Sequence, residues 1–154
     1  MPRREYGAPK QITPRSPGDY LEVITKAAFQ AGISWAVIEA KWDGIRECFH
    51  GFDARAVADM TPEDVDALME DTRVIRNRKK IEATIDNALA VIELDEEYDG
   101  FGNYLDSLGD FEAKVKRLRK DFRFLGDFGA YYFLYVVGQE VPPHDEYRAS
   151  RAKT

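Results

Sequence analysis

The sequence predicts an all-α protein folded as a single compact domain. Over most of the chain, apolar residues recur at steps of three and four, as they do along one face of an amphipathic helix. Serine, threonine and aspartate precede several of these runs, where their side chains can cap a helix. No segment alternates strictly between polar and apolar residues, and no internal repeat is visible. With 154 residues and 44% hydrophobic content, the chain can bury one substantial core.

Three segments are expected along the chain. Residues 1–18 are rich in proline and lack periodicity, which predicts an extended N-terminal arm. Residues 19–147 carry the helical patterns and form the domain, and residues 148–154 form a C-terminal tail.

Two helices are predicted at the start of the domain. The first is marked by apolar residues at helical spacing, namely Leu21, Ile24, Ala28 and Ala31. Gly32 is suited to a left-handed helix end, and Ser34 can cap a second helix that begins at Trp35. That second helix carries an apolar stripe at Trp35, Ile38, Trp42, Ile45 and Phe49.

Shorter helices and one longer helix follow. Asp53 can cap a short turn over residues 54–58, and Thr61-Pro62 followed by two acids is a strong helix start. A longer helix that runs to about Leu94 is marked by Ile81, Ile85, Ala88, Leu89 and Ile92.

The C-terminal part predicts two helices joined by a tight hairpin. The elements are, in order, a loop over 95–110 with one helical turn at 104–108, a helix over 111–120, a hairpin at 122–126 and an apolar helix over 130–137. Residues 131–137 are also rich in β-formers, but a single strand would have no partner in this chain.

The composition excludes several classes of protein. Cys48 is the single cysteine, so an internal disulfide is excluded, and with only His50 and His144 no familiar Cys/His metal site can be assembled. We therefore expect no metal and no cofactor. No apolar run approaches the roughly 20 residues that span a bilayer, and the expected location is the cytoplasm. A net charge of −6 argues against a protein that coats nucleic acid indiscriminately.

Two motifs carry a family resemblance. They are QAGISW at Gln30–Trp35 and CFHGFD at Cys48–Asp53, and the pair resembles the 3-methyladenine DNA glycosylase I family. The similarity continues in VIRNRKKI at residues 74–81 and around the hairpin at 122–126. The resemblance implies a helix-hairpin-helix glycosylase-like domain for DNA base-excision repair. Such an enzyme flips a damaged base and hydrolyses the N-glycosidic bond of an alkylated purine. The expected partner is double-stranded DNA with a damaged base, bound by a monomer.

The resemblance also suggests residues that contact the base. Trp35 matches the family's pocket tryptophan, although it also begins the apolar stripe of its helix. Phe29 and Tyr6 are further candidates for base binding. The family's base-reading glutamate falls at Ala27 here, and the positions of the family's zinc ligands carry no cysteine pair, so this chain departs from the family at both places.

Asp145 is the candidate catalytic residue. It follows Gly138 at a spacing that resembles that of the catalytic aspartate in the wider helix-hairpin-helix glycosylase superfamily. Such a carboxylate would stabilise positive charge at the sugar or activate water. Its alternative role is an ion pair with Arg148. The residues expected to contact DNA are Arg76, Arg78, Lys79, Lys120, Arg123, Phe124 and Gly126.

Two other functions remain open from the sequence. The domain could be a non-catalytic helix-hairpin-helix protein that binds DNA without cleaving the glycosidic bond. It could also be a protein-interaction module that docks a partner on the apolar helix at 130–137.

Overall fold

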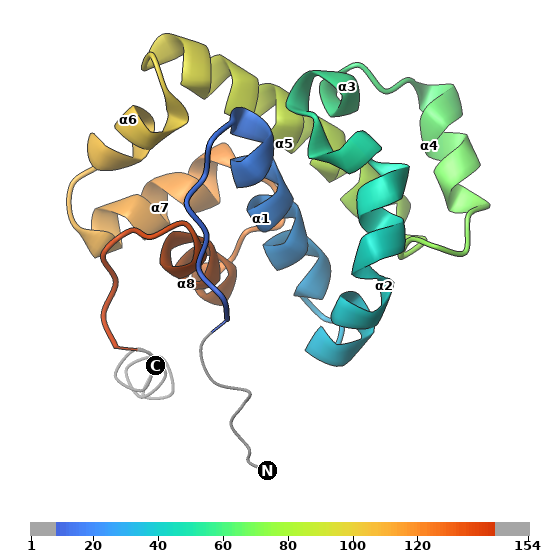
Figure 1. Ribbon diagram of the computed structural model, residues 1–154, viewed down its shortest axis with the longest axis horizontal. Coiled ribbons are helices and arrows are strands. Elements are labelled where there is room, and N and C mark those ends of the chain that lie inside the picture. Colours follow the sequence, from blue (N-terminus) through green and yellow to red (C-terminus); the bar gives the residue numbers. More distant parts are fainter. Residues whose placement is uncertain (1–8, 144–154) are drawn as a thin grey trace.

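The computed structural model describes residues 9–143, and in that part of the chain all regular structure is helical (Figure 1). This confirms the predicted all-α class, and the segment 131–137 lies in a helix rather than a strand. The elements are α1 (Pro17–Gln30), α2 (Trp35–Cys48), the short 3₁₀ helix η2 (His50–Phe52), α3 (Ala54–Ala58), α4 (Pro62–Met69), α5 (Arg78–Glu97), α6 (Phe101–Asp106), α7 (Phe111–Asp121) and α8 (Asp127–Val136).

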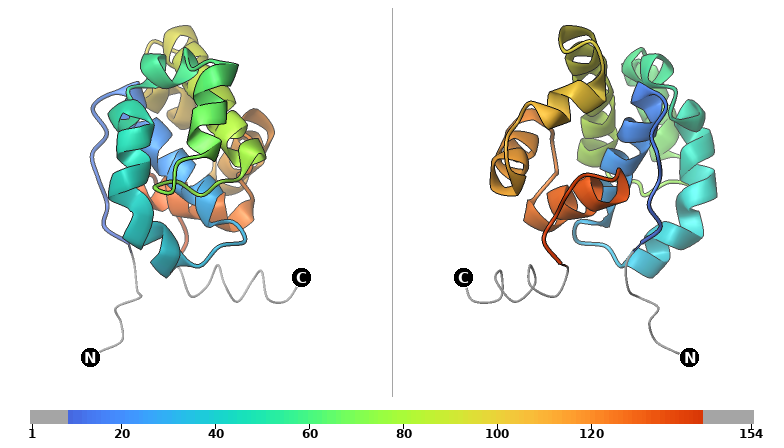
Figure 2. Two further views of the ribbon diagram at one scale, coloured as in Figure 1. Left: turned by 90° about the vertical axis from the view of Figure 1, so that its right-hand side faces the viewer. Right: turned by 60° about the vertical axis from the view of Figure 1, so that its left-hand side comes forward.

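Helix α1 forms the centre of the fold and packs against α2, α3, α5 and α8. Figures 1 and 2 show it running through the middle of the molecule in every view. It begins earlier than expected because Ser16 accepts the N–H of Asp19 and Pro17 occupies the first turn. The arm before it therefore ends two residues short of the predicted boundary.

The predicted caps of the next helices are confirmed. Ser34 accepts the N–H of Val37 at the start of α2, and Asp53 accepts the N–H of Ala56 in α3. Thr61 forms a reciprocal capping box at the start of α4. Most of the predicted stripe of α2 is buried in the core, namely Ile38, Trp42, Ile45 and Phe49.

The longer helix and the loop after it differ from the prediction in extent. α5 begins at Arg78, capped by Asn77, and continues to Glu97. Leu89, placed in its apolar stripe, is 46% exposed. α6 forms inside the segment expected to be mainly a loop, because Asp95 accepts the N–H of Phe101 and holds the chain where the helix starts.

The predicted helix, hairpin and helix are present as α7, residues 122–126 and α8. Asn87 of α5 fixes the hairpin, since its side chain accepts the N–H of Arg123 at 2.9 Å and donates to the Arg123 carbonyl at 3.1 Å. One face of α8 lies in the core through Ala130, Phe133 and Leu134. This face of the apolar segment at 130–137 is therefore part of the core and is not available as a docking face for a partner.

The described part of the arm lies against the end of α8. The N–H of Ile12 donates to the carbonyl of Val136 at 2.8 Å, and the side chain of Gln11 donates to the carbonyl of Tyr135 at 2.9 Å. Within residues 9–143, none of the helices combines the length and the apolar character needed to cross a membrane.

Candidate functional site

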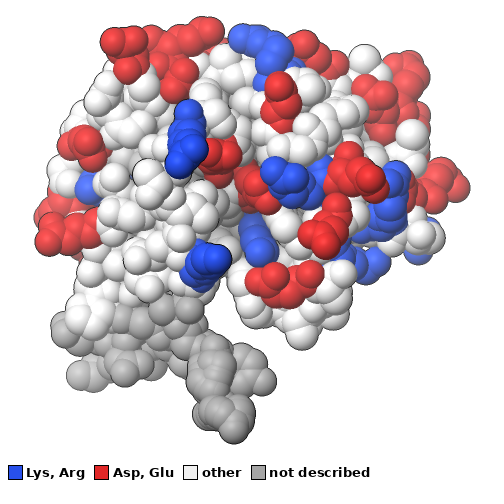
Figure 3. Space-filling model, viewed as in Figure 1, with Lys and Arg blue, Asp and Glu red and all other residues white. Residues whose placement is uncertain are grey.

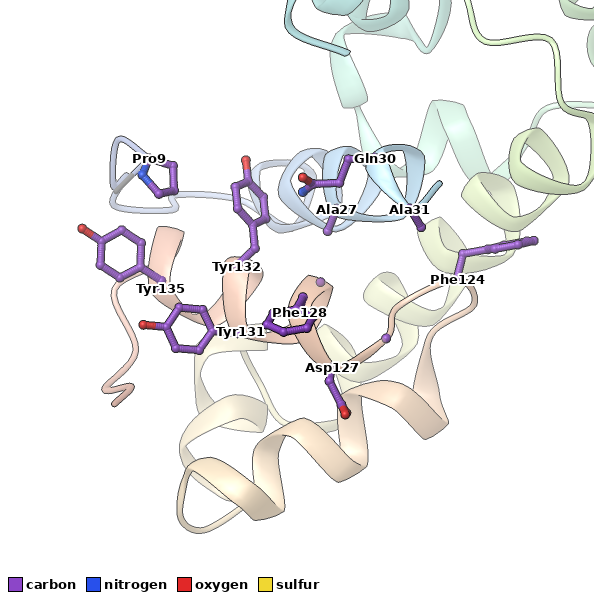
Figure 4. Close-up of a pocket in the computed structure, with 12 residues that line it drawn as sticks. Pro9, Ala27, Gln30, Ala31, Phe124, Asp127, Phe128, Tyr131, Tyr132 and Tyr135 are labelled. Carbon is purple, nitrogen blue, oxygen red and sulfur yellow. The ribbon is translucent and has the colours of Figure 1, made fainter. Parts of the chain in front are cut away.

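A cavity of about 460 Å³ lies where α1, the hairpin, α8 and the arm meet (Figure 4). Its volume is within the range of sites that hold small molecules. The wall consists of Pro9, Ala27, Gln30, Ala31, Phe124, Gly126, Asp127, Phe128, Gly129, Tyr131, Tyr132 and Tyr135.

Helix α8 supplies most of the aromatic wall. Phe128, Tyr131, Tyr132 and Tyr135 are spaced by three, one and three residues, which places them on one side of a helix. Ala130, Phe133, Leu134 and Val136 of the same helix are buried in the core. Phe124 of the hairpin adds a fifth ring at the edge of the cavity.

Among residues 9–143, the cavity wall contains one carboxylate, and that group is engaged elsewhere. Asp127 accepts a hydrogen bond from Arg119 of α7 at 2.9 Å. Figure 4 shows the Asp127 side chain directed away from α1 and toward α7. Within the described residues, the side chains lining the cavity therefore present rings, small residues and neutral polar groups to a ligand.

Tyr132 is a neutral phenol in this setting. Burial raises the pKa of its hydroxyl, and the carboxylates of Glu39 and Glu22 raise it further. Tyr131 beside it donates its hydroxyl to the carbonyl of Pro142 at 2.6 Å.

Small residues bring α1 and α8 together at one side of the cavity. A methyl group built on Gly129 would lie 3.7 Å from the Cβ of Ala27 and 3.2 Å from Leu125. Ala27 itself is 2% exposed. The position matched to the family's base-reading glutamate is therefore in the cavity wall, but here it contributes only a methyl group.

Trp35 is next to the cavity but is not part of its wall. Its ring lies 5.5 Å from the ring of Tyr132 in an edge-to-face arrangement. The ammonium of Lys26, paired with Glu39 at 3.2 Å, lies 5.2 Å from the centre of the Trp35 ring. The structure thus places Trp35 where it supports Tyr132, and sequence reasoning missed Tyr132 as the wall residue.

The other predicted base contacts are located as follows. Phe29 is fully buried and packs edge-to-face on Phe49, so its side chain belongs to the core rather than to the cavity wall. Tyr6 and the candidate catalytic Asp145 lie outside the described residues.

The predicted DNA-contacting cations fall into two groups. Arg78 pairs with Asp66 at 2.7 Å, and Arg123 pairs with Asp86 at 2.6 Å. Arg76, Lys79 and Lys120 are exposed and form no ion pair with another described residue. In Figure 3, Lys and Arg are interspersed with Asp and Glu rather than joined in one basic tract.

The hairpin at 122–126 borders the cavity. Phe124 is 39% exposed and adopts a left-handed backbone with φ of 61°, and Phe128 is 55% exposed. Gly126 precedes α8 as its N-cap and makes no side-chain hydrogen bond there.

The sequence is similar to those of known DNA glycosylases. A family model described as methyladenine glycosylase matches residues 12–125. The chain is 30% identical to DNA-3-methyladenine glycosylase 1 of Escherichia coli, over 87% of this chain and 81% of that protein. It is 33% identical to DNA-3-methyladenine glycosylase of Haemophilus influenzae, over 66% of this chain and 53% of that protein.

Solved structures show the same fold. A crystal structure of 3-methyladenine DNA glycosylase I superposes with a TM-score of 0.72 at 29% identity, covering 82% of this chain and 81% of the other. The Staphylococcus aureus 3-methyladenine DNA glycosylase I superposes with a TM-score of 0.74 at 24% identity, covering 88% and 84% of the two chains.

Proposed function

Because the chain belongs to the methyladenine glycosylase family, we propose that it is a base-excision repair glycosylase that hydrolyses the N-glycosidic bond of an alkylated purine in duplex DNA. The observation that carries this proposal is the aromatic cavity beside the hairpin. A flipped base can enter the cavity while the hairpin holds the backbone of the strand it left. The relatives are bacterial proteins, and we propose that this one acts as a monomer in the cytoplasm.

The aromatic wall supplies the binding energy for the flipped base. Stacking on an aromatic side chain contributes roughly 1 to 3 kcal/mol for each base. A base made cationic by alkylation is further attracted to the face of an electron-rich ring. Tyr132, whose ring packs edge-to-face with that of Trp35, is the residue we assign to this contact.

The chemistry requires little help from the protein. The alkylated purine already carries a positive charge, so the electron pair of the glycosidic bond passes to the base as that bond breaks, and the base leaves as a neutral molecule. Water then adds to C1′ of the sugar and loses a proton. Asp145 is the proposed carboxylate that stabilises the positive charge on the sugar or accepts this proton.

The proposed DNA grip uses both groups of cations. Arg76, Lys79 and Lys120 are available to phosphates directly. Arg78 and Arg123 would exchange their carboxylate partners for phosphates, a step that weakens their net contribution. Phe124 and Gly126 would meet the backbone at the hairpin.

Release of alkylated bases from methylated duplex DNA tests the proposal. The wild type should release them faster than they are lost spontaneously in buffer. Tyr132→Ala should lower the rate roughly 5- to 150-fold, since about 1 to 3 kcal/mol of stacking is lost and each 1.4 kcal/mol is a factor of ten. Leu89→Ala, an exposed change on α5 outside the cavity wall, is the control. Binding without release by the wild type would favour the non-catalytic DNA-binding alternative.

Asp145→Asn separates the two mechanisms of hydrolysis. A large loss of rate with unchanged DNA affinity supports a catalytic carboxylate. An unchanged rate would mean that binding and the charge of the base are sufficient.

A further inference from the structure

We infer that the cavity accepts alkylated guanine as well as alkylated adenine. The inference rests on the proposed function and adds the substrate class. It follows from the hydrogen-bonding groups of the wall, because each described side chain that is free to meet a base can both donate and accept.

The polar side chains of the wall are Gln30, Asp127, Tyr131, Tyr132 and Tyr135. Two of them are already engaged, since Asp127 accepts from Arg119 and Tyr131 donates to the carbonyl of Pro142 at 2.6 Å. The side chains of Gln30, Tyr132 and Tyr135 form no hydrogen bond with another described residue.

These three groups do not discriminate between the two purines. At position 6, adenine presents an amino donor and guanine a carbonyl acceptor. An ionised carboxylate can only accept hydrogen bonds and would select the amino group. A carboxamide carries both a donor and an acceptor, and a flip of the side chain exchanges their positions. Phenol hydroxyls also donate or accept. Neither purine therefore leaves a buried group unpaired, which is the main source of strong discrimination between such substrates.

The shape of the cavity also permits the larger base. Guanine carries an additional amino group at position 2, and both helices contribute small residues to the wall, Ala27 and Ala31 at the end of α1 and Gly129 of α8. Stacking on an aromatic ring of the wall does not depend on which edge groups the purine carries. The class of substrate is thus the cationic N-alkylated purines of both kinds, because neutral bases gain the stacking without the additional attraction of a cation to the ring faces.

The test compares release of 3-methyladenine and 7-methylguanine from one methylated duplex, each expressed as an enhancement over its spontaneous loss. The wild type should enhance release of both bases at least about tenfold. Gln30→Glu replaces the carboxamide by an acceptor of nearly the same shape. It should raise the ratio of adenine to guanine release at least about tenfold, because the carboxylate repels the guanine carbonyl.

Gln30→Met is the matched control, since it keeps the length of the side chain without a hydrogen-bonding group and should leave the ratio within about threefold of the wild type. Far-ultraviolet circular dichroism establishes that both variants are folded. Release of 3-methyladenine without 7-methylguanine, or an unchanged ratio in folded Gln30→Glu, would overturn the inference and leave the proposed function intact. Release of neither base would overturn both.

Discussion

Lys80→Met is expected to lower the free energy of unfolding by about 2 to 4 kcal/mol. Lys80 lies in the first turn of α5 and is only 6% exposed, and its ammonium donates to the carbonyls of Phe29 at 3.1 Å and Ala31 at 2.5 Å. These carbonyls belong to the end of α1 and its C-cap, where the helix itself offers no partner. The side chain therefore ties the end of α1, and with it the Gln30 wall of the cavity, to α5.

The magnitude follows from two opposing effects. Hydrogen bonds from a charged donor contribute about 1.5 to 3 kcal/mol each, so two bonds are worth roughly 3 to 6 kcal/mol. Burial of the ammonium offsets part of this gain, and the same burial lowers the pKa of Lys80. Methionine fills a similar volume without that cost, but it leaves both carbonyls without a donor.

Urea unfolding followed by circular dichroism measures the difference. Lys79→Met is the matched control, because Lys79 is the exposed neighbour without an ion pair among the described residues, and surface changes of this kind stay within about 0.5 kcal/mol. An unfolding free energy for Lys80→Met that equals that of the control would refute the argument that this lysine joins the two helices.

Three further outcomes are expected. Burial, and then the hydrogen bond to Asp71, raise the pKa of the Cys48 thiol from 9.0 to about 11. The stability that the protonated thiol contributes is therefore complete below pH 9.0 and is lost as the pH rises through about 11. In Cys48→Ala, the urea midpoint should therefore fall less steeply with pH over that interval, and a slope equal to that of the wild type would contradict this prediction. Gly18→Ala should destabilise the fold by at least about 2 kcal/mol in urea unfolding, because its methyl group would clash with the carbonyl oxygen of Phe52, whereas Gly126→Ala has open space and should be neutral for stability. Lys120→Ala should weaken binding to duplex DNA of any sequence and reduce the salt dependence of the logarithm of affinity by about 1, a change that titrations at several salt concentrations can detect or exclude.

Local signals in the sequence predicted the helices well. Ser34, Asp53 and Thr61 act as caps where they were expected, since a cap depends only on the three residues that follow it. The hairpin at 122–126 was equally visible, because glycine and the end of an apolar pattern mark it within a few residues. Family motifs then supplied the fold that these elements adopt.

The cavity could not be predicted from local signals. Tyr132 and Phe128 come into the wall only because α8 packs against α1, which is a contact between segments about a hundred residues apart. The same is true of Lys80, which the sequence presents as one cation in a basic run. Its burial depends on the end of α1, and no neighbouring residue indicates it.

Helical geometry could, however, have corrected one assignment before the structure was known. Successive residues of an α-helix turn by about 100°, so positions 30 and 31 lie within about 60° of position 27, whereas position 29 points about 200° away. Ala27, Gln30 and Ala31 accordingly share the cavity wall, and Phe29 lies in the core. Lys26 lies on another side of the same helix, which faces α2. If position 27 reads the base in relatives and carries only a methyl group here, the residue able to take over that contact is the polar neighbour on the same face. That residue is Gln30, and a carboxamide in place of a carboxylate changes which bases can be read as well as how strongly they are held.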